Sequence, residues 1–188
     1  MKKMKILIFL ENGFEDSEFI YPYYRFQEEG YKVDIVAPKA NQKYIGKHGV
    51  SFTSELSPEQ VNLDSYDAVI IPGGKAPDSM RLSEGLVKIV KEANQRDMVI
   101  AAVCHGPQML ISADIVRGRH VTSWPSIWVD LKNAGANVIE NQSAVTDGNL
   151  VTSRSPDDLP DFCVATIALL NSQKLEDVVA PISSRALE

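Results

Sequence analysis

The stretch from Val99 to Leu110, VIAAVCHGPQML, constrains the fold of this chain more than any other. Its five apolar or small residues, Val99–Val103, are typical of a buried strand, and Cys104 follows them directly at an HGP break. Gln108–Ala113 then has the pattern of the start of a helix. A strand that turns sharply into a helix places the thiol at the bend, where the helix dipole favours negative charge. We therefore expect an α/β fold with a reactive thiolate at Cys104.

Other apolar runs in the first half of the chain also end at turn-forming residues. Ile6–Leu10 is continuously apolar, as expected for a central parallel strand that helices cover on both faces. The apolar runs alternate with segments of helical periodicity, and such units build a parallel sheet. The expected strands are Ile6–Leu10, Val33–Ala37 and Ala68–Ile71, and the expected helices are Glu15–Glu29 and Leu86–Ala93. Pro22 is expected to kink or delay the first of these helices.

Shorter elements are predicted for the rest of the chain. Asn41–Leu56 indicates an irregular or hairpin excursion, and Asp147-Gly148 is a strong hairpin signal. A last helix is expected over Asp157–Leu170, opened by a proline at its start. The remaining predicted elements are the strands His120–Thr122, Asn137–Ile139, Ala144–Thr146 and Leu150–Ser153 and the helix Ile127–Ala134.

The length of the chain indicates one compact domain. Its 188 residues can bury a substantial core, and no break in their pattern divides them. We expect this domain to span residues 1–170. Residues 171–188 are then a C-terminal extension that packs loosely or makes a contact.

Charge and cysteine content restrict the class of protein. The net charge of −6 argues against broad nucleic-acid binding. Two cysteines are too few for a secreted disulfide framework, so we expect a cytoplasmic protein. The apolar run Ile6–Leu10 near the N-terminus is too short for a signal peptide or a membrane span, and we expect no membrane association.

Three loops are expected to meet at one edge of the sheet, because the carboxyl ends of parallel strands lie together there. They are residues 11–18, 72–78 and 104–108, and they contain acids, glycines and the thiol. A protonated carboxyl group beside the thiol would stabilise a thiolate, whereas a carboxylate would oppose it. The N–H groups of Gly74 and His105 could hold an oxyanion, worth about 3 to 4 kcal/mol per donor in hydrolases. A tight turn explains Gly73-Gly74 equally well.

Four motifs in this order resemble the DJ-1/PfpI superfamily, and most closely its PfpI-like intracellular protease/amidase branch. They span about residues 4–170 and are NGFEDSE at 12–18, IPGGKAP at 71–77, AVCHGP at 102–107 and SRSPDDL at 153–159. The resemblance implies a flavodoxin-like three-layer sandwich with a mostly parallel central sheet, related to class I glutamine amidotransferases. It also implies a homodimer or higher homo-oligomer with sites near subunit contacts.

The same resemblance assigns roles to residues of the expected site. It makes Cys104 the reactive thiol and Glu18 its carboxyl partner. Gly73 and Gly74 belong to the oxyanion loop, in which Gly74 and His105 supply the backbone donors. His105 is also the base that the PfpI branch implies, although a residue adjacent to the cysteine usually points elsewhere. A histidine that caps the bend or makes a subunit contact is the alternative.

Four further residues carry narrower expectations. Asp78 would complete the site from a neighbouring subunit, where family members commonly have the longer glutamate. Trp124 stands where relatives often carry tyrosine or histidine facing the pocket, so it bears on substrate preference. Glu15 either lines the pocket or acts on the helix dipole. Cys163, on an apolar helix, is expected to be an inert core thiol.

The resemblance supports two enzymatic hypotheses and the thiol supports a third hypothesis. The leading one is a protease/amidase-like hydrolase that acts on a peptide through a thioester. The alternative is glyoxalase III-type or deglycase activity on methylglyoxal and its adducts, which a small pocket near Trp124 would favour. The third is a non-enzymatic redox or stress sensor in which Cys104 is oxidised beside Glu18. His48 and His120 show no metal-site spacing and no phosphate-binding loop is present, so we expect no metal and no cofactor.

Overall fold

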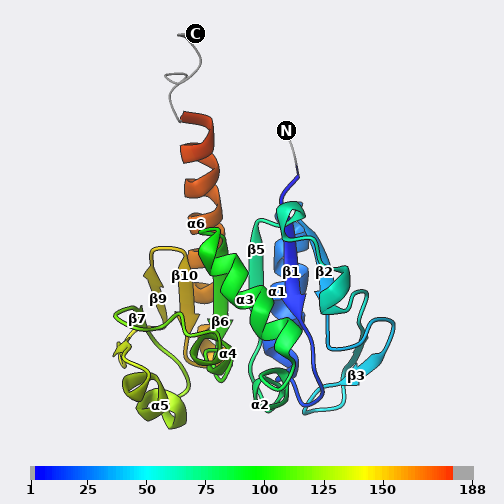
Figure 1. Cartoon of the computed structure of the whole chain (residues 1–188), viewed down its shortest axis with the longest axis horizontal. Coiled ribbons are helices and arrows are strands. Elements are labelled where there is room, and N and C mark those ends of the chain that lie inside the picture. The colour runs from blue at the N-terminus through cyan, green and yellow to red at the C-terminus, as the bar shows by residue number, and fades with distance from the viewer. Residues whose placement is uncertain (1–2, 180–188) are drawn as a thin grey trace.

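A six-stranded sheet forms the centre of the computed structural model, which describes residues 3–179, with side chains up to residue 175 (Figure 1). Its strand order is β2-β1-β5-β6-β10-β9. All neighbouring strands run parallel except β9, which pairs antiparallel with β10 at one edge. The strands are β1 (Lys5–Phe9), β2 (Lys32–Val36), β5 (Ala68–Ile71), β6 (Val99–Val103), β9 (Ala144–Asp147) and β10 (Leu150–Ser153).

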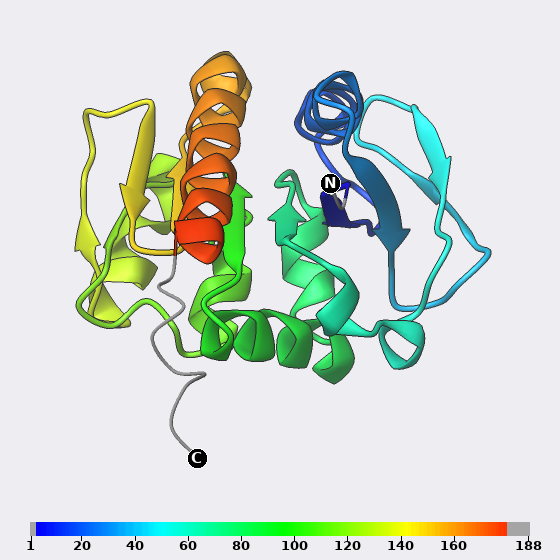
Figure 2. The ribbon, with the colours of Figure 1, turned by 90° about the horizontal axis from the view of Figure 1, so that it is seen from above.

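Helices cover both faces of this sheet. Figure 2 shows α1 and α6 side by side on one face and α3 on the other. The short helix α4 packs against α3, and α2 packs against α4. The helices are α1 (Asp16–Glu28), α2 (Ala76–Met80), α3 (Glu84–Gln95), α4 (Gln108–Ser112), α5 (Trp128–Asn133) and α6 (Leu159–Val179). The predicted three-layer α/β sandwich with a mostly parallel sheet is confirmed.

Burial explains why the central strands form where they do. Every residue of β5, β6 and β10 is buried, as expected for parallel strands between two helical layers. On α3, Leu86, Ile89, Val90 and Ala93 recur at helical spacing and are all buried against the sheet. Ser83 caps this helix by accepting a hydrogen bond from the N–H of Leu86 at 3.4 Å.

Two small sheets lie outside the central one. The hairpin of β3 (Lys43–Ile45) and β4 (Ser51–Thr53) confirms the excursion predicted for residues 41–56. In the second small sheet, β7 (His120–Val121) pairs parallel with β8 (Asn137–Val138). Short 3₁₀ helices occupy Pro58–Gln60, Leu63–Ser65, Pro125–Ile127 and Pro156–Asp158.

The structure decides two predictions about helices in part. Pro22 does not delay or end α1, which runs from Asp16 to Glu28 with Pro22 inside it. The last helix begins at Leu159 and continues past Leu170 to Val179, beyond the predicted end. Its later turns contact the domain, because Gln173 Nε2 donates to the carbonyl of Asp97 at 2.9 Å. The C-terminal extension therefore starts as a continuation of α6, and its residues 180–188 lie outside the described residues. Between residues 3 and 179, no helix combines the length and the apolar character needed to cross a membrane.

Candidate active site

Cys104 lies on a sharp bend at the carboxyl end of β6. Its φ of 60° is positive, which is strained for a residue with a side chain and is typical of a nucleophile held at a strand-to-helix turn. Two backbone hydrogen bonds fix this residue. The N–H of Cys104 donates to the carbonyl of Ser153 at 3.0 Å, and the carbonyl of Cys104 accepts from the N–H of Trp124 at 2.9 Å. The thiol residue is only 7% exposed. The predicted strand, bend and helix are therefore present, with a nearly buried sulfur at the bend.

The loops after β1, β5 and β6 meet at this bend, as predicted. The N–H of Gly73 donates to Glu18 Oε2 at 2.8 Å. A Cβ atom on Gly73 would lie 2.6 Å from that oxygen and 2.8 Å from Cys104 Cβ. Gly74 has a φ of 78°, and a Cβ there would clash with the backbone nitrogen of Glu15. Both glycines are required by the close approach of three loops and not only by a turn.

The carboxyl group of Glu18 is fully buried beside the thiol, at 0% exposure. Burial raises its pKa from the ordinary 4.5 to about 7, and the hydrogen bond from Gly73 only partly opposes this. Within the described part of the chain, Oε1 has no hydrogen-bond partner. An unpaired buried carboxylate oxygen is costly, so both observations favour a protonated Glu18 at and below neutral pH. Such a carboxyl group can donate a hydrogen bond toward sulfur.

The Cys104 thiol is held in its neutral form when Glu18 is charged. Burial and the nearby Glu18 charge raise the pKa of the thiol to about 12, while the N–H groups of Gly74 and His105 lower it. Burial and the Glu18 charge therefore act against the acidic thiol that the helix N-terminus led us to expect. The helix α4 has only five residues and begins at Gln108, so burial outweighs its dipole. A thiolate at Cys104 therefore needs a base and a neutral Glu18.

His105 turns its ring toward the sulfur although it is the next residue in the chain. Its Nδ1 lies 3.3 Å from Cys104 Sγ. The ring also stacks on Trp124, with centroids 6.4 Å apart and an interplanar angle of 26°. Burial, together with the positive charge of Lys47, lowers the pKa of His105 below its ordinary value. The imidazole is therefore neutral near pH 7 and placed to accept the thiol proton.

Asp78 lies on the exposed side of α2, within the IPGGKAPD segment that follows β5. Among the described side chains of this single chain, none of the hydrogen bonds or ion pairs joins Asp78 to His105. The role expected for Asp78 concerns a second copy of the chain, and it stays a prediction. Trp124 is 42% exposed and faces His105, so it does lie at the site.

The turn of the β3–β4 hairpin brings two residues to the site that the sequence did not indicate. Glu15 pairs with Lys47 Nζ and with His48 Nε2, both at 3.2 Å. Asp16 fixes this turn by accepting from the N–H groups of His48 and Val50, both at 2.9 Å. Lys47 is close enough to lower the pKa of both Glu18 and His105. Glu15 therefore contacts the hairpin turn beside the site, and the two roles expected for it stay predictions.

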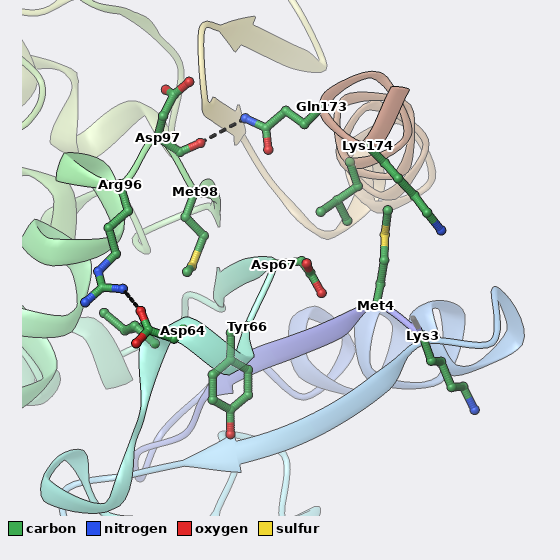
Figure 3. A pocket seen from close by; sticks show the side chains of 12 residues that line it. Lys3, Met4, Asp64, Tyr66, Asp67, Arg96, Asp97, Met98, Gln173 and Lys174 are labelled. Atoms are coloured by element: carbon green, nitrogen blue, oxygen red, sulfur yellow. Dashed lines mark hydrogen bonds and ion pairs between the residues drawn. The ribbon is translucent and has the colours of Figure 1, made fainter. Parts of the chain in front are cut away.

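A cavity of about 560 Å³ lies at the opposite edge of the sheet, away from Cys104 (Figure 3). Its lining comes from residues that precede β1, β5 and β6 and from α6, including Met4, Asp67, Met98 and Lys174. None of the residues that line it belongs to the three loops around the thiol. The cavity is therefore separate from the candidate active site.

The structure also places Cys163 and His120. Cys163 is 0% exposed, which confirms a core thiol. His120 Nδ1 lies 3.2 Å from Asp147 Oδ2 at the edge of the sheet, far along the chain from Cys104. Among residues 3–175, no three His, Cys, Asp or Glu side chains are grouped so that they could hold a metal ion.

A family profile, curated relatives and a solved structure all match most of this chain. The sequence profile described as the DJ-1/PfpI family matches residues 4–169. The Deglycase PfpI of Pyrococcus furiosus is 45% identical over 156 residues, which cover 83% of this chain and 93% of that protein. The Protein/nucleic acid deglycase 2 of Escherichia coli is 38% identical over 169 residues, covering 89% and 98%. The crystal structure of Drosophila melanogaster DJ-1beta matches with a TM-score of 0.84 at 26% identity, covering 95% and 97%.

Proposed function

The chain belongs to the DJ-1/PfpI family, and from this membership and the Cys104 site we propose that it is a cysteine-dependent deglycase-type enzyme. Its substrates would be methylglyoxal and the adducts that methylglyoxal forms with amines and thiols. Family membership confirms the resemblance drawn from the four motifs. The observation that carries the proposal is a thiol only 7% exposed, next to a fully buried carboxyl group whose pKa is about 7. A small dicarbonyl reaches such a sulfur more easily than a peptide backbone does.

The proposed reaction starts with addition of the thiol to the aldehyde. Cys104 gives its proton to His105 Nδ1, 3.3 Å away, and sulfur forms a bond to the aldehyde carbon. The carbonyl electron pair moves to oxygen, which takes up a proton to complete a hemithioacetal. The N–H groups of Gly74 and His105, which face the sulfur, would stabilise that oxygen while it is negative. With an adduct, the amine or thiol that carried the dicarbonyl leaves as sulfur takes its place.

Conversion to product then needs no external oxidant. The proton of the former aldehyde carbon is removed to give an enediol, the former ketone carbon takes up a proton, and the hydroxyl proton passes from the first oxygen to the second, so the first carbon is oxidised and the second is reduced. The result is a lactoyl thioester on Cys104. Water adds to this thioester, the C–S bond breaks, lactate leaves, and a proton returns to sulfur. Glu18 and His105 are the groups at the site that can carry these protons, because the pKa of Glu18 is about 7 and that of His105 is lowered from 6.5.

Peptide or amide hydrolysis through a thioester is the rival hypothesis. It uses the same thiol and the same backbone donors. Both relatives described above are named deglycases, which favours the deglycase reaction instead. Oxidation of Cys104 beside a protonated Glu18 would support the sensor hypothesis, and mild peroxide followed by mass spectrometry tests it.

One experiment separates the enzymatic hypotheses. The purified protein and Cys104→Ala are compared for lactate formation from methylglyoxal, for release of N-acetylcysteine from its methylglyoxal adduct, and for cleavage of fluorogenic peptides. We expect dicarbonyl turnover by the wild type and background rates for Cys104→Ala. Cys163→Ala, which changes the buried thiol, is the matched control and should keep full turnover. Equal rates for the wild type and Cys104→Ala contradict the proposal, and peptide cleavage alone supports the rival hypothesis.

We also propose that the chain forms a homo-oligomer in which Asp78 of one copy approaches the site of another. The position of Asp78 on the exposed side of α2 supports this. Light scattering measures the assembly, and Asp78→Asn should lower turnover only if the carboxylate takes part. A monomer at assay concentration with unchanged turnover in Asp78→Asn contradicts it.

A further inference from the structure

Both ring nitrogens of His105 have partners within this one chain. Nδ1 lies 3.3 Å from Cys104 Sγ, and Nε2 lies 3.3 Å from the hydroxyl oxygen of Ser126. Ser126 is 21 residues further along the chain, on the exposed 3₁₀ turn Pro125–Ile127. The imidazole therefore bridges the thiol and a hydroxyl group that comes from a different loop.

The turn that carries Ser126 is fixed to the bend that carries the thiol. The N–H of Trp124 donates to the carbonyl of Cys104 at 2.9 Å, and the N–H of Ile127 donates back to Trp124 at 3.1 Å. Ser123 Oγ donates to the carbonyl of Trp124 at 3.0 Å, and Trp128 Nε1 donates to Ser123 at 3.0 Å. These four bonds fix the backbone of the turn that carries Ser126 to the bend that carries the sulfur.

A neutral imidazole carries a proton on one nitrogen and a lone pair on the other. To take the thiol proton, His105 must present the lone pair at Nδ1, which requires the proton at Nε2. An oxygen that accepts a hydrogen bond from Nε2–H stabilises that arrangement and prevents the ring from rotating away. The hydroxyl of Ser126 is such an acceptor, and, unlike a carboxylate, it adds no negative charge that would favour the imidazolium.

We propose that Ser126 is a positioning residue for His105, so that one chain provides a Cys104–His105–Ser126 relay. This inference rests on the proposed function, because it assumes that His105 takes the proton of Cys104. Ser126 acts from within the chain, and this role is separate from the one proposed for Asp78 of a second copy. The stacked ring of Trp124 and the hydroxyl of Ser126 together define the plane and the direction of the imidazole.

Two measurements test the relay, and one of them does not need turnover. The first is the rate at which iodoacetamide alkylates Cys104 across a range of pH. The second is kcat and KM for methylglyoxal. We expect Ser126→Ala to lower the alkylation rate near neutral pH and kcat about two- to tenfold, the loss of one ordinary hydrogen bond, with KM unchanged. Ser126→Thr, which keeps the hydroxyl, should restore both to within about twofold.

A charged variant of Ser126 adds a second readout, the pH dependence of Cys104 alkylation, which would stay the same if Ser126 had only a structural role. In Ser126→Asp, a carboxylate next to Nε2 raises the pKa of His105. Because the base must be neutral to act, the acid limb of the alkylation profile should move up by about one pH unit. Ser172→Ala, on the exposed part of α6, is the matched control and should behave as the wild type. Circular dichroism and urea unfolding show whether each variant keeps its fold.

The outcomes separate the relay from the proposed function. If Cys104→Ala keeps dicarbonyl turnover, the proposed function fails, and alkylation still reports on Ser126. If Cys104→Ala is inactive while Ser126→Ala matches the wild type in alkylation and in kcat, the relay is overturned and the proposed function stands. An unmoved acid limb in Ser126→Asp also overturns the relay.

Discussion

Replacing Glu18 with glutamine should change how stability depends on pH. The buried carboxyl group has a pKa of about 7 in the folded chain and an ordinary value of 4.5. Between these values the folded chain keeps a proton that the unfolded chain has released, so the free energy of unfolding falls as the pH rises. From pH 5 to pH 8 the wild type should lose on the order of 2 to 3 kcal/mol relative to Glu18→Gln.

The physical reason is that an amide does not ionise but keeps the shape of the side chain. In the wild type the N–H of Gly73 donates to Glu18 Oε2 at 2.8 Å. In Glu18→Gln the side-chain carbonyl oxygen can accept the same hydrogen bond. The amide N–H₂ can donate toward Cys104, as a protonated carboxyl group does. We therefore also expect the thiol pKa to be lower in the variant above pH 7, because the repulsion from a charged Glu18 is gone.

Urea unfolding at pH 5 and pH 8 measures how much the free energy of unfolding changes between the two pH values in the wild type and in Glu18→Gln. Glu28→Gln, which removes an exposed carboxylate from the same helix, is the matched control and should retain the pH dependence of the wild type. If the wild type and Glu18→Gln change in parallel between the two pH values, Glu18 is not a buried acid with a raised pKa. The assignment of a protonated Glu18 beside the thiol would then be refuted.

Three further predictions follow from the packing around the site. Gly73→Ala places a methyl carbon 2.8 Å from Cys104 Cβ, so urea unfolding should show a loss of about 1 to 3 kcal/mol and alkylation of the thiol should change. Asp16→Ala leaves two backbone N–H groups of the turn 46–50 without their acceptor, so limited proteolysis of this turn should become faster. Unchanged cleavage would contradict the view that Asp16 holds the turn in place. Cys163→Ala should leave native thiol labelling unchanged, since that thiol is 0% exposed, and a lost label would contradict it.

The elements that carry the site could be predicted closely from the sequence. Val99–Val103 and Ala68–Ile71 match β6 and β5 residue for residue. Strands buried on both faces must be continuously apolar, and glycine or proline marks their ends, so both bounds are visible in the sequence. The meeting of Glu18, Gly73 and Cys104 follows from the same logic, because Gly73 and Cys104 stand in the loops after β5 and β6, and Glu18 lies in the first turn of the helix that follows β1.

The extent of α6 could not be predicted in this way. The polar residues after Leu170 suggested an end, but a polar stretch alone does not stop a helix. Between Leu170 and Pro181 the sequence contains neither glycine nor proline. The helix accordingly continues to Val179.

Side-chain directions at the site were also out of reach. His105 is adjacent to Cys104, and only the positive φ of that cysteine turns the two side chains toward each other. Lys47 and Ser126 reach the site because a hairpin turn and a 3₁₀ turn fold over it, and no local pattern marks either residue. The acidity of the thiol depends on burial and on one carboxyl group, which a strand-and-helix pattern does not reveal.

The most direct test of the central claim is to trap the bond between Cys104 and the substrate. Purified protein is mixed with methylglyoxal, quenched in acid during turnover, and analysed by intact mass and peptide mapping. We predict the added mass of one methylglyoxal on the peptide that contains Cys104, and its loss in Cys104→Ala. Continued turnover with Cys104 unmodified, or with modification confined to lysine and arginine side chains, would contradict the claim that this thiol is the nucleophile.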